Sequence, residues 1–130
     1  MKIDDKIVLE IGAMILQCED VMESKWDFVS FVFDISDNHI ANSGFLYIDD
    51  EISPASAEIE DDPLRLDDKI ITLREKVRQQ YGESFKQLLI QMESKQNRIK
   101  INFEFDNPER WSINPKNIID MREHLRPVFD

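Results

Sequence analysis

The sequence has few of the residues that build metal sites and catalytic sites. It contains one cysteine, Cys18, and two histidines, His39 and His124, among 130 residues. A single cysteine forms no intramolecular disulfide, and these three residues match neither a zinc-ligand spacing nor a Cys-His nucleophile pair. Three glycines in all leave no glycine-rich loop to hold a phosphate. We therefore expect no cofactor, no bound metal and no catalytic residue.

Basic residues and long hydrophobic runs are also scarce. Lys and Arg number 16 against 27 Asp and Glu, a formal net charge of -11. Phosphate backbones and anionic membrane surfaces are then poor partners, whereas a basic protein is a good one. The first ten residues carry acids where a signal peptide carries basic residues, and no apolar run is long enough to span a membrane. We expect a cytoplasmic protein that binds neither nucleic acid nor membranes.

The hydrophobic content and the spacing of apolar residues predict one α+β domain over residues 1–130. Hydrophobic residues make up 42% of the chain, enough for a single core. Apolar residues at steps of three and four predict a helix over 4–22 with Cys18 on its buried side. A second helix follows Asp62 as N-cap and Pro63 as first residue and ends at Gly82. A third begins at Asn114-Pro115 and ends before Arg126-Pro127.

Four segments read as strands. The aromatic and β-branched segment 26–35 predicts a strand covered on both faces, and 41–49 returns beside it after a turn with His39 at its tip. Segments 85–93 and 98–106 form a second hairpin, and the alternation in 98–106 predicts the floor of the core. The expected fold is an antiparallel sheet of about four strands, in the order α-β-β-α-β-β-α, with helices on one face.

The most biased stretch of the chain is 49–62, which holds seven carboxylates and no basic residue. It reads as an exposed acidic loop: first a solvated surface that favours solubility, second a surface for docking a protein, and last a metal site. Glu104, Asp106, Glu109 and a partly exposed Trp111 form a second candidate region. The candidate partner-binding residues are Asp49, Asp50, Glu51, Glu58, Glu60, Asp61, Asp62, Glu104, Asp106, Glu109 and Trp111.

Several segments together resemble the YezG-like immunity proteins. They are SKWDFVSFVFDI, SGFLYID, LREKVRQQYG and KINFEFDNPERW, within a resemblance that covers residues 2–111. Members of that family are cytoplasmic antitoxins encoded beside polymorphic toxins. The resemblance implies that this chain binds and neutralises the toxic, often nuclease, C-terminal domain of a cognate toxin, without catalysis of its own.

The leading hypothesis is thus a non-enzymatic immunity protein that covers the active site of a basic nuclease domain in a 1:1 heterodimer. Two alternatives stay open. One is a metal-dependent hydrolase that uses acidic pairs such as Asp49-Asp50 or Asp61-Asp62. The other is a regulatory module that self-associates through an exposed sheet edge.

Overall fold

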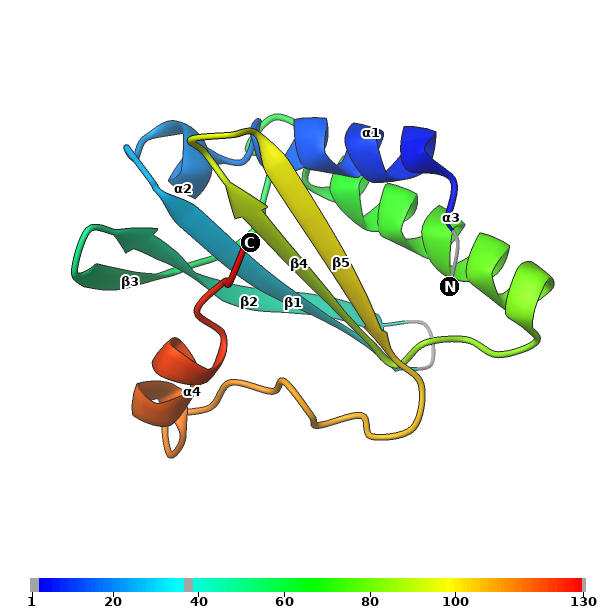
Figure 1. Ribbon diagram of the computed structural model, residues 1–130. Helices are drawn as coiled ribbons and strands as arrows, with labels where there is room; N and C mark the ends of the chain where they lie inside the picture. Colours follow the sequence, from blue (N-terminus) through cyan, green and yellow to red (C-terminus); the bar gives the residue numbers. More distant parts are fainter. Residues whose placement is uncertain (1–2, 37–38, 130) are drawn as a thin grey trace.

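The computed structural model describes residues 3–36 and 39–129, which form an α+β fold around one open antiparallel sheet (Figure 1). The sheet has five strands in the order β3-β2-β1-β4-β5. The elements are α1 (Asp5–Ile15), α2 (Glu19–Met22), β1 (Phe28–Ser36), β2 (His39–Ile48), β3 (Glu51–Ala55), α3 (Pro63–Tyr81), β4 (Gln87–Glu93), β5 (Arg98–Glu104) and α4 (Ile118–His124). The expected fold class and the two long hairpins are confirmed.

One face of the sheet is covered by α1 and α3, and the main core lies beneath them. Each helix places one apolar stripe on the sheet, because residues three and four apart share a face. The buried residues are Ile7, Ile11 and Ile15 of α1, Leu66, Ile70, Leu73 and Val77 of α3, and Val29, Phe31, Phe33, Leu88 and Ile90 of the two central strands. This layer holds most of the apolar burial that stabilises the fold.

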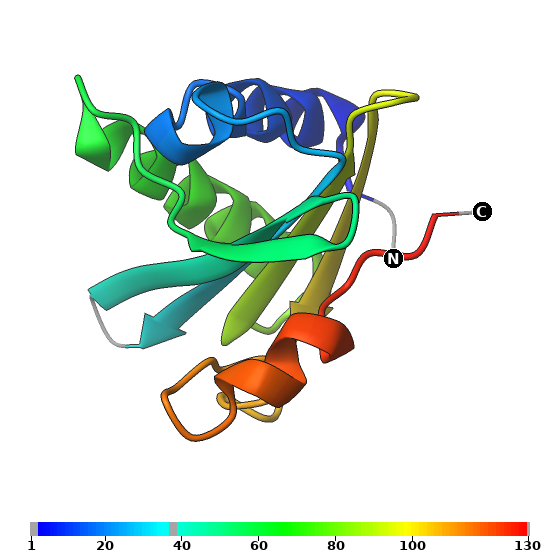
Figure 2. The same ribbon diagram turned by 90° about the vertical axis from the view of Figure 1, so that its left-hand side faces the viewer.

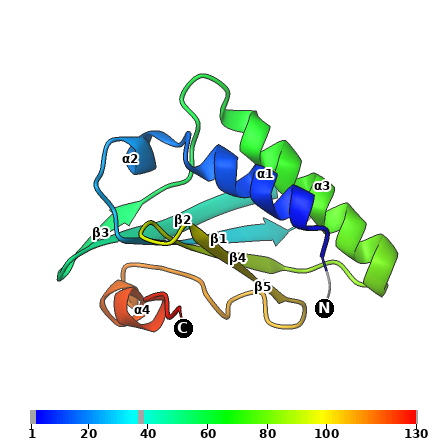
Figure 3. The same cartoon turned by 45° about the horizontal axis from the view of Figure 1, so that its top comes forward.

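The other face is covered by the C-terminal segment, 107–129, which includes α4 (Figure 3). The side chains of the second core are Val32, Phe45, Tyr47 and Leu89 from the sheet, with Trp111, Met121 and Leu125 from the segment. The expectation that helices cover one face only is therefore wrong. Strand β1 is covered on both faces, as its lack of alternation predicted.

Polar side chains of the sheet hold the C-terminal segment through its backbone. Ser30 Oγ and Gln91 Nε2 both donate to the carbonyl oxygen of Leu125, at 2.5 and 3.0 Å. Tyr47 Oη donates to the carbonyl oxygen of Arg122 at 2.8 Å. Ser30 and Gln91 are buried, so these bonds satisfy groups that would be costly to leave unpaired.

Helix α3 has the ends that the sequence predicted. Pro63 is its first residue, and Gly82 ends it in the left-handed conformation at φ 84°. Asp62 occupies the N-cap position without a side-chain cap hydrogen bond.

The other two helices differ from the prediction. The first ends at Ile15 instead of continuing to Met22, and Cys18 sits, buried as expected, at the N-cap position of the separate turn α2. The third begins at Ile118, because Asn114 Oδ1 accepts from the backbone N–H groups of Lys116 and Asn117 and holds that stretch as a turn.

Three expectations about the strands are also wrong. Residues Glu51–Ala55, expected as loop, pair with β2 as the edge strand β3. His39 is not at a loop tip but begins β2 opposite Ser36. Residues 37–38 lie outside the described part of the chain. The strand from Arg98 is an edge strand with half-buried apolar residues and is not the floor of the core.

No helix in the described residues is both long and apolar enough to cross a membrane.

Candidate protein-binding surfaces

The seven carboxylates of 49–62 lie in two groups and not in one patch. Asp49, Asp50 and Glu51 form the exposed turn between β2 and β3, where Asp49 takes a positive φ of 51° and its N–H donates to Asp27 Oδ2 at 2.7 Å. Strand β3 then carries the chain away from this turn, so the segment that follows β3 and holds the other carboxylates lies at the other end of the strand (Figure 1). A partner that contacts one group need not contact the other.

The carboxylates that follow β3 lie beside those of α2, and together they form one surface. We call it the α2 acidic surface, and its residues are Glu19, Asp20, Glu23, Glu58, Glu60 and Asp61. Two hydrogen bonds hold its halves together. The backbone N–H of Glu19 donates to the carbonyl oxygen of Glu58 at 3.2 Å, and the backbone N–H of Ser56 donates to the side-chain Oδ2 of Asp20 at 2.9 Å. Figure 2 shows α2 beside the segment that leads from β3 to α3.

A shallow hollow of about 140 Å³ opens on this surface. Its acidic lining comes from Glu19, Glu23, Glu60 and Asp61, and its apolar lining from Ile59 and Met22. The Met22 side chain is 66% exposed. Such a hollow suits the side chain of a lysine or arginine, whose methylene stem packs on apolar atoms while its charged end meets carboxylates.

The carboxylates of this surface repel one another. The pKa of the Glu19 carboxyl is raised, first by the negative charge of Glu60 and then by that of Glu23, with smaller effects from burial, Asp20 and Glu58. Carboxylates held this close disfavour one another's charged form. A cation brought by a partner would relieve that repulsion, so the surface favours basic partners.

The candidate region of Glu104, Asp106, Glu109 and Trp111 has mainly a structural role. Glu104 accepts hydrogen bonds from the backbone N–H groups of Asp106 and Asn107, at 3.0 and 3.1 Å, and from Arg110 at 2.9 Å. These donors, Asn107 first, lower the pKa of the Glu104 carboxyl to about 2. Glu104 therefore fixes the turn after β5, while Asp106 and Glu109 are exposed on that turn.

Trp111 does not lie on the surface. It is 4% exposed and packs in the second core, and its backbone N–H donates to Gln87 Oε1 at 2.8 Å. Arg110 covers the ring, with its guanidinium carbon 4.9 Å from the ring centroid. The expectation of a partly exposed aromatic anchor is wrong, because the C-terminal segment folds back onto the sheet.

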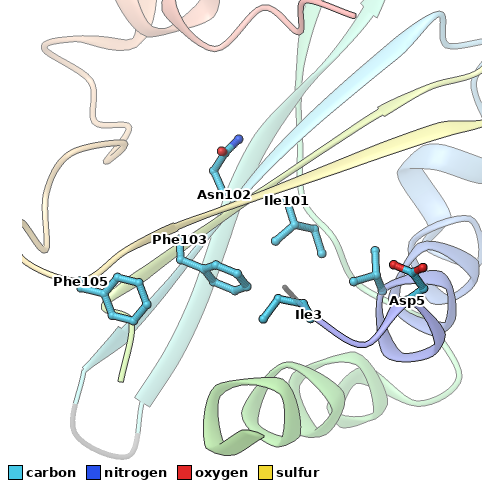
Figure 4. Close-up of a pocket in the computed structure, with 7 residues that line it drawn as sticks. Ile3, Asp5, Ile101, Asn102, Phe103 and Phe105 are labelled. Atoms are coloured by element: carbon cyan, nitrogen blue, oxygen red, sulfur yellow. The ribbon is translucent and has the colours of Figure 1, made fainter. Parts of the chain in front are cut away.

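An apolar flank along α1 and β5 was not predicted from the sequence. A hollow of about 450 Å³ is lined by Ile3, Asp5, Val8, Ile101, Asn102, Phe103 and Phe105 (Figure 4). A second hollow of about 250 Å³ lies beyond it toward the β4–β5 turn, with Leu9, Leu16, Trp26 and Ile99 in its lining. Leu9 is 65% and Leu16 47% exposed. The unusual exposure of large apolar residues marks this flank as a candidate contact surface.

Neither a scan against protein-family models nor a search of curated proteins finds a match to this chain. Within the residues that the structure describes, no group of three or more His, Cys, Asp or Glu side chains is placed to hold a metal ion. The acidic pairs Asp49-Asp50 and Asp61-Asp62 lie in the two separate groups described above.

Sequence reasoning missed the α2 carboxylates. Glu19 and Asp20 fall within the helix predicted over 4–22 and Glu23 directly after it, and no local signal places them beside Glu58 and Glu60, some 40 residues further along the chain. Their one visible signal was three acids within five residues.

Proposed function

We propose that this chain is a cytoplasmic immunity protein that binds the basic, nuclease domain of a cognate toxin and blocks its active site, one toxin domain to each chain. The observation that carries the proposal is the α2 acidic surface of six carboxylates. Glu19, Glu23, Glu60 and Asp61 line its open hollow, and Asp20 and Glu58 line a smaller hollow that also contacts Glu19. The resemblance of residues 2–111 to YezG-like immunity proteins supports the same function.

Electrostatic attraction is the physical basis of the proposed inhibition. Nucleases that bind a phosphate backbone carry a basic groove, and a carboxylate surface is attracted to that groove and competes with the nucleic acid for it. Opposite charge on the two proteins speeds their encounter, and contacts within the hollow then slow dissociation. Inhibition of this kind requires no catalytic group on the immunity protein.

The hydrolase alternative gains no support, since the acidic pairs on which it depends are split between two ends of β3 and no metal-binding group is found in the described residues.

The test is co-expression of the tagged chain with the open reading frame immediately upstream of its gene, followed by capture. The proposal would be supported if the captured domain is basic, degrades nucleic acid when it is assayed by itself, and no longer does so when this chain is added back. Failure to capture any neighbour that is demonstrably expressed would contradict it.

A charge reversal locates the interface. Glu60→Lys places a cation in the α2 acidic surface and should slow association with the captured toxin domain and reduce its dependence on salt. Glu83→Lys is the matched control, because Glu83 is exposed beyond the end of α3 and outside that surface. Equal association rates for the two variants would move the interface away from α2.

A further inference from the structure

The outer edge of β5 is open to another strand. β5 is last in the strand order, and its one partner among the described residues is β4. The opposite edge strand, β3, is five residues long and contains Pro54, both of which discourage pairing between sheet edges. β5 has seven residues and neither proline nor glycine. The sheet is therefore protected at one edge and accessible at the other.

The charges of β5 complement those of a second copy of β5. Two cations stand at its start and one carboxylate at its end. Arg98 pairs with Glu93 of β4 at 2.7 Å and Lys100 Nζ donates to the carbonyl oxygen of Val128 at 3.1 Å, while Glu104 accepts from Arg110 at 2.9 Å. A contact between two copies would add to these pairs within each chain. Antiparallel pairing about a two-fold axis at Ile101, the middle residue of the strand, places Arg98 opposite Glu104 of the second copy and Lys100 opposite Asn102. Opposite charges across two strands stabilise their pairing, whereas parallel pairing in register would set like charges side by side.

The apolar flank has the same self-complementarity. In the register centred on Ile101, Ile99 lies opposite Phe103 of the second copy. The exposed side chains of Leu9 and Leu16 line the 250 Å³ hollow together with Ile99. Phe103 lines the 450 Å³ hollow (Figure 4). The two-fold axis thus brings the exposed leucines of each copy next to the hollow of the other. Association would remove the exposed leucines and the apolar lining of the hollow from water.

We propose that the chain forms a two-fold dimer through the outer edge of β5, in which two five-stranded sheets become one continuous sheet and the α1 flanks are covered. This inference does not rest on the immunity function. The α2 acidic surface packs beside the segment that follows β3, the opposite edge strand, so the dimer leaves it open. Each copy can then hold its own toxin domain.

Analytical ultracentrifugation of the free chain over a range of micromolar concentrations tests the proposal. The expected result is a concentration-dependent species of twice the 15.4 kDa chain mass. A chain that stays monomeric throughout would overturn the dimer.

Substitutions at Asn102 test the register, because this residue is exposed on β5 and faces Lys100 of the second copy. Asn102→Lys creates two like-charge pairs in each dimer and should raise the dissociation constant about tenfold, whereas Asn102→Asp creates two opposite pairs and should lower it roughly threefold to tenfold. Adding Lys100→Glu to Asn102→Lys should restore dimerisation. Equal dissociation constants for the Lys and Asp variants would overturn pairing through β5.

The flank is tested by Leu9→Lys, which should also weaken the dimer, against Leu64→Lys as control. Leu64 is as exposed as Leu9, at 66%, but begins α3 away from β5. Circular dichroism of each variant checks that it is folded. A folded Leu9→Lys protein with unchanged dimerisation would exclude α1 from the contact. A monomeric chain that loses toxin binding on Asn102→Lys would assign this edge to the toxin and overturn the dimer.

Discussion

Gly44 is the position where the smallest change in the sequence should cost the most stability. It lies in β2 opposite Phe31 of β1. A Cβ atom built on Gly44 would stand 2.1 Å from the carbonyl oxygen of Ser30 and 2.6 Å from Cδ1 of Phe31. Contacts this short cannot persist, and one of the two atoms belongs to the backbone of a central strand. Gly44→Ala therefore forces β1 and β2 apart, in the middle of the sheet.

The cost can be estimated from overpacking in other cores, which is typically 1–3 kcal/mol and more where the backbone must move. We expect Gly44→Ala to lower the free energy of unfolding by about 3 kcal/mol and the melting temperature by about 10 °C for a chain of this length. Urea unfolding followed by fluorescence of the buried Trp111 measures the effect.

Gly12→Ala is the matched control. Its Cβ would meet Cδ1 of Ile99 at 3.2 Å, the end of a side chain on the open edge strand, which can move aside. Alanine is also favoured over glycine in a helix such as α1 by up to about 1 kcal/mol. A Gly44→Ala protein within about 0.5 kcal/mol of the original, the scale of an ordinary surface substitution, would refute the close approach of β1 and β2.

Three further predictions concern other parts of the fold. The pKa of Glu104 in the folded chain, about 2, lies below its ordinary value of 4.5. Its ionised form therefore stabilises the fold above pH 4.5, and this contribution is lost as the pH falls toward 2. The difference in unfolding free energy between the original chain and Glu104→Gln should be largest near neutral pH and should shrink between pH 4.5 and 2. Burial raises the pKa of the Cys18 thiol to about 12, so a thiol reagent should label Cys18 only as the chain unfolds, and rapid labelling in native buffer would contradict its place in the core. Ser30→Ala removes a hydrogen bond to the carbonyl oxygen of Leu125 and should lower the free energy of unfolding by about 1–3 kcal/mol in urea titrations, whereas Ser53→Ala on the exposed side of β3 should change it little.

Local signals were sufficient for the elements whose ends are set by their own residues. Helix α3 is the clearest case, because Pro63 and Gly82 fix its ends and four apolar residues fix its buried side. The hairpin of β4 and β5 is another, although its turn uses Asn97 at a positive φ of 52° in place of glycine. In both cases the sequence pattern and the final packing agree.

The elements that were missed depend on contacts between distant parts of the chain. Strand β3 contains Pro54 and few apolar residues, and it is a strand because β2 offers an edge for it to pair with. The C-terminal segment that covers the second face is held by the apolar contacts of Trp111, Met121 and Leu125. It is also held by Ser30 and Gln91, polar strand residues whose side chains donate to the carbonyl oxygen of Leu125.

The candidate surface was misjudged for the same reason. Composition marks the acidic stretch 49–62, but β3 divides it, and only the folded chain brings α2 beside Glu58 and Glu60. Likewise, the burial of Trp111 follows from the return of the C-terminal segment to the sheet, which no local pattern indicates.

The most direct test of the proposed function is a growth assay in cells that express the product of the upstream gene from an inducible promoter. We expect this product alone to stop growth, co-expression of the chain to restore it, and Glu60→Lys to restore it less well than Glu83→Lys. Toxicity that persists in full beside the folded, expressed chain would contradict the account.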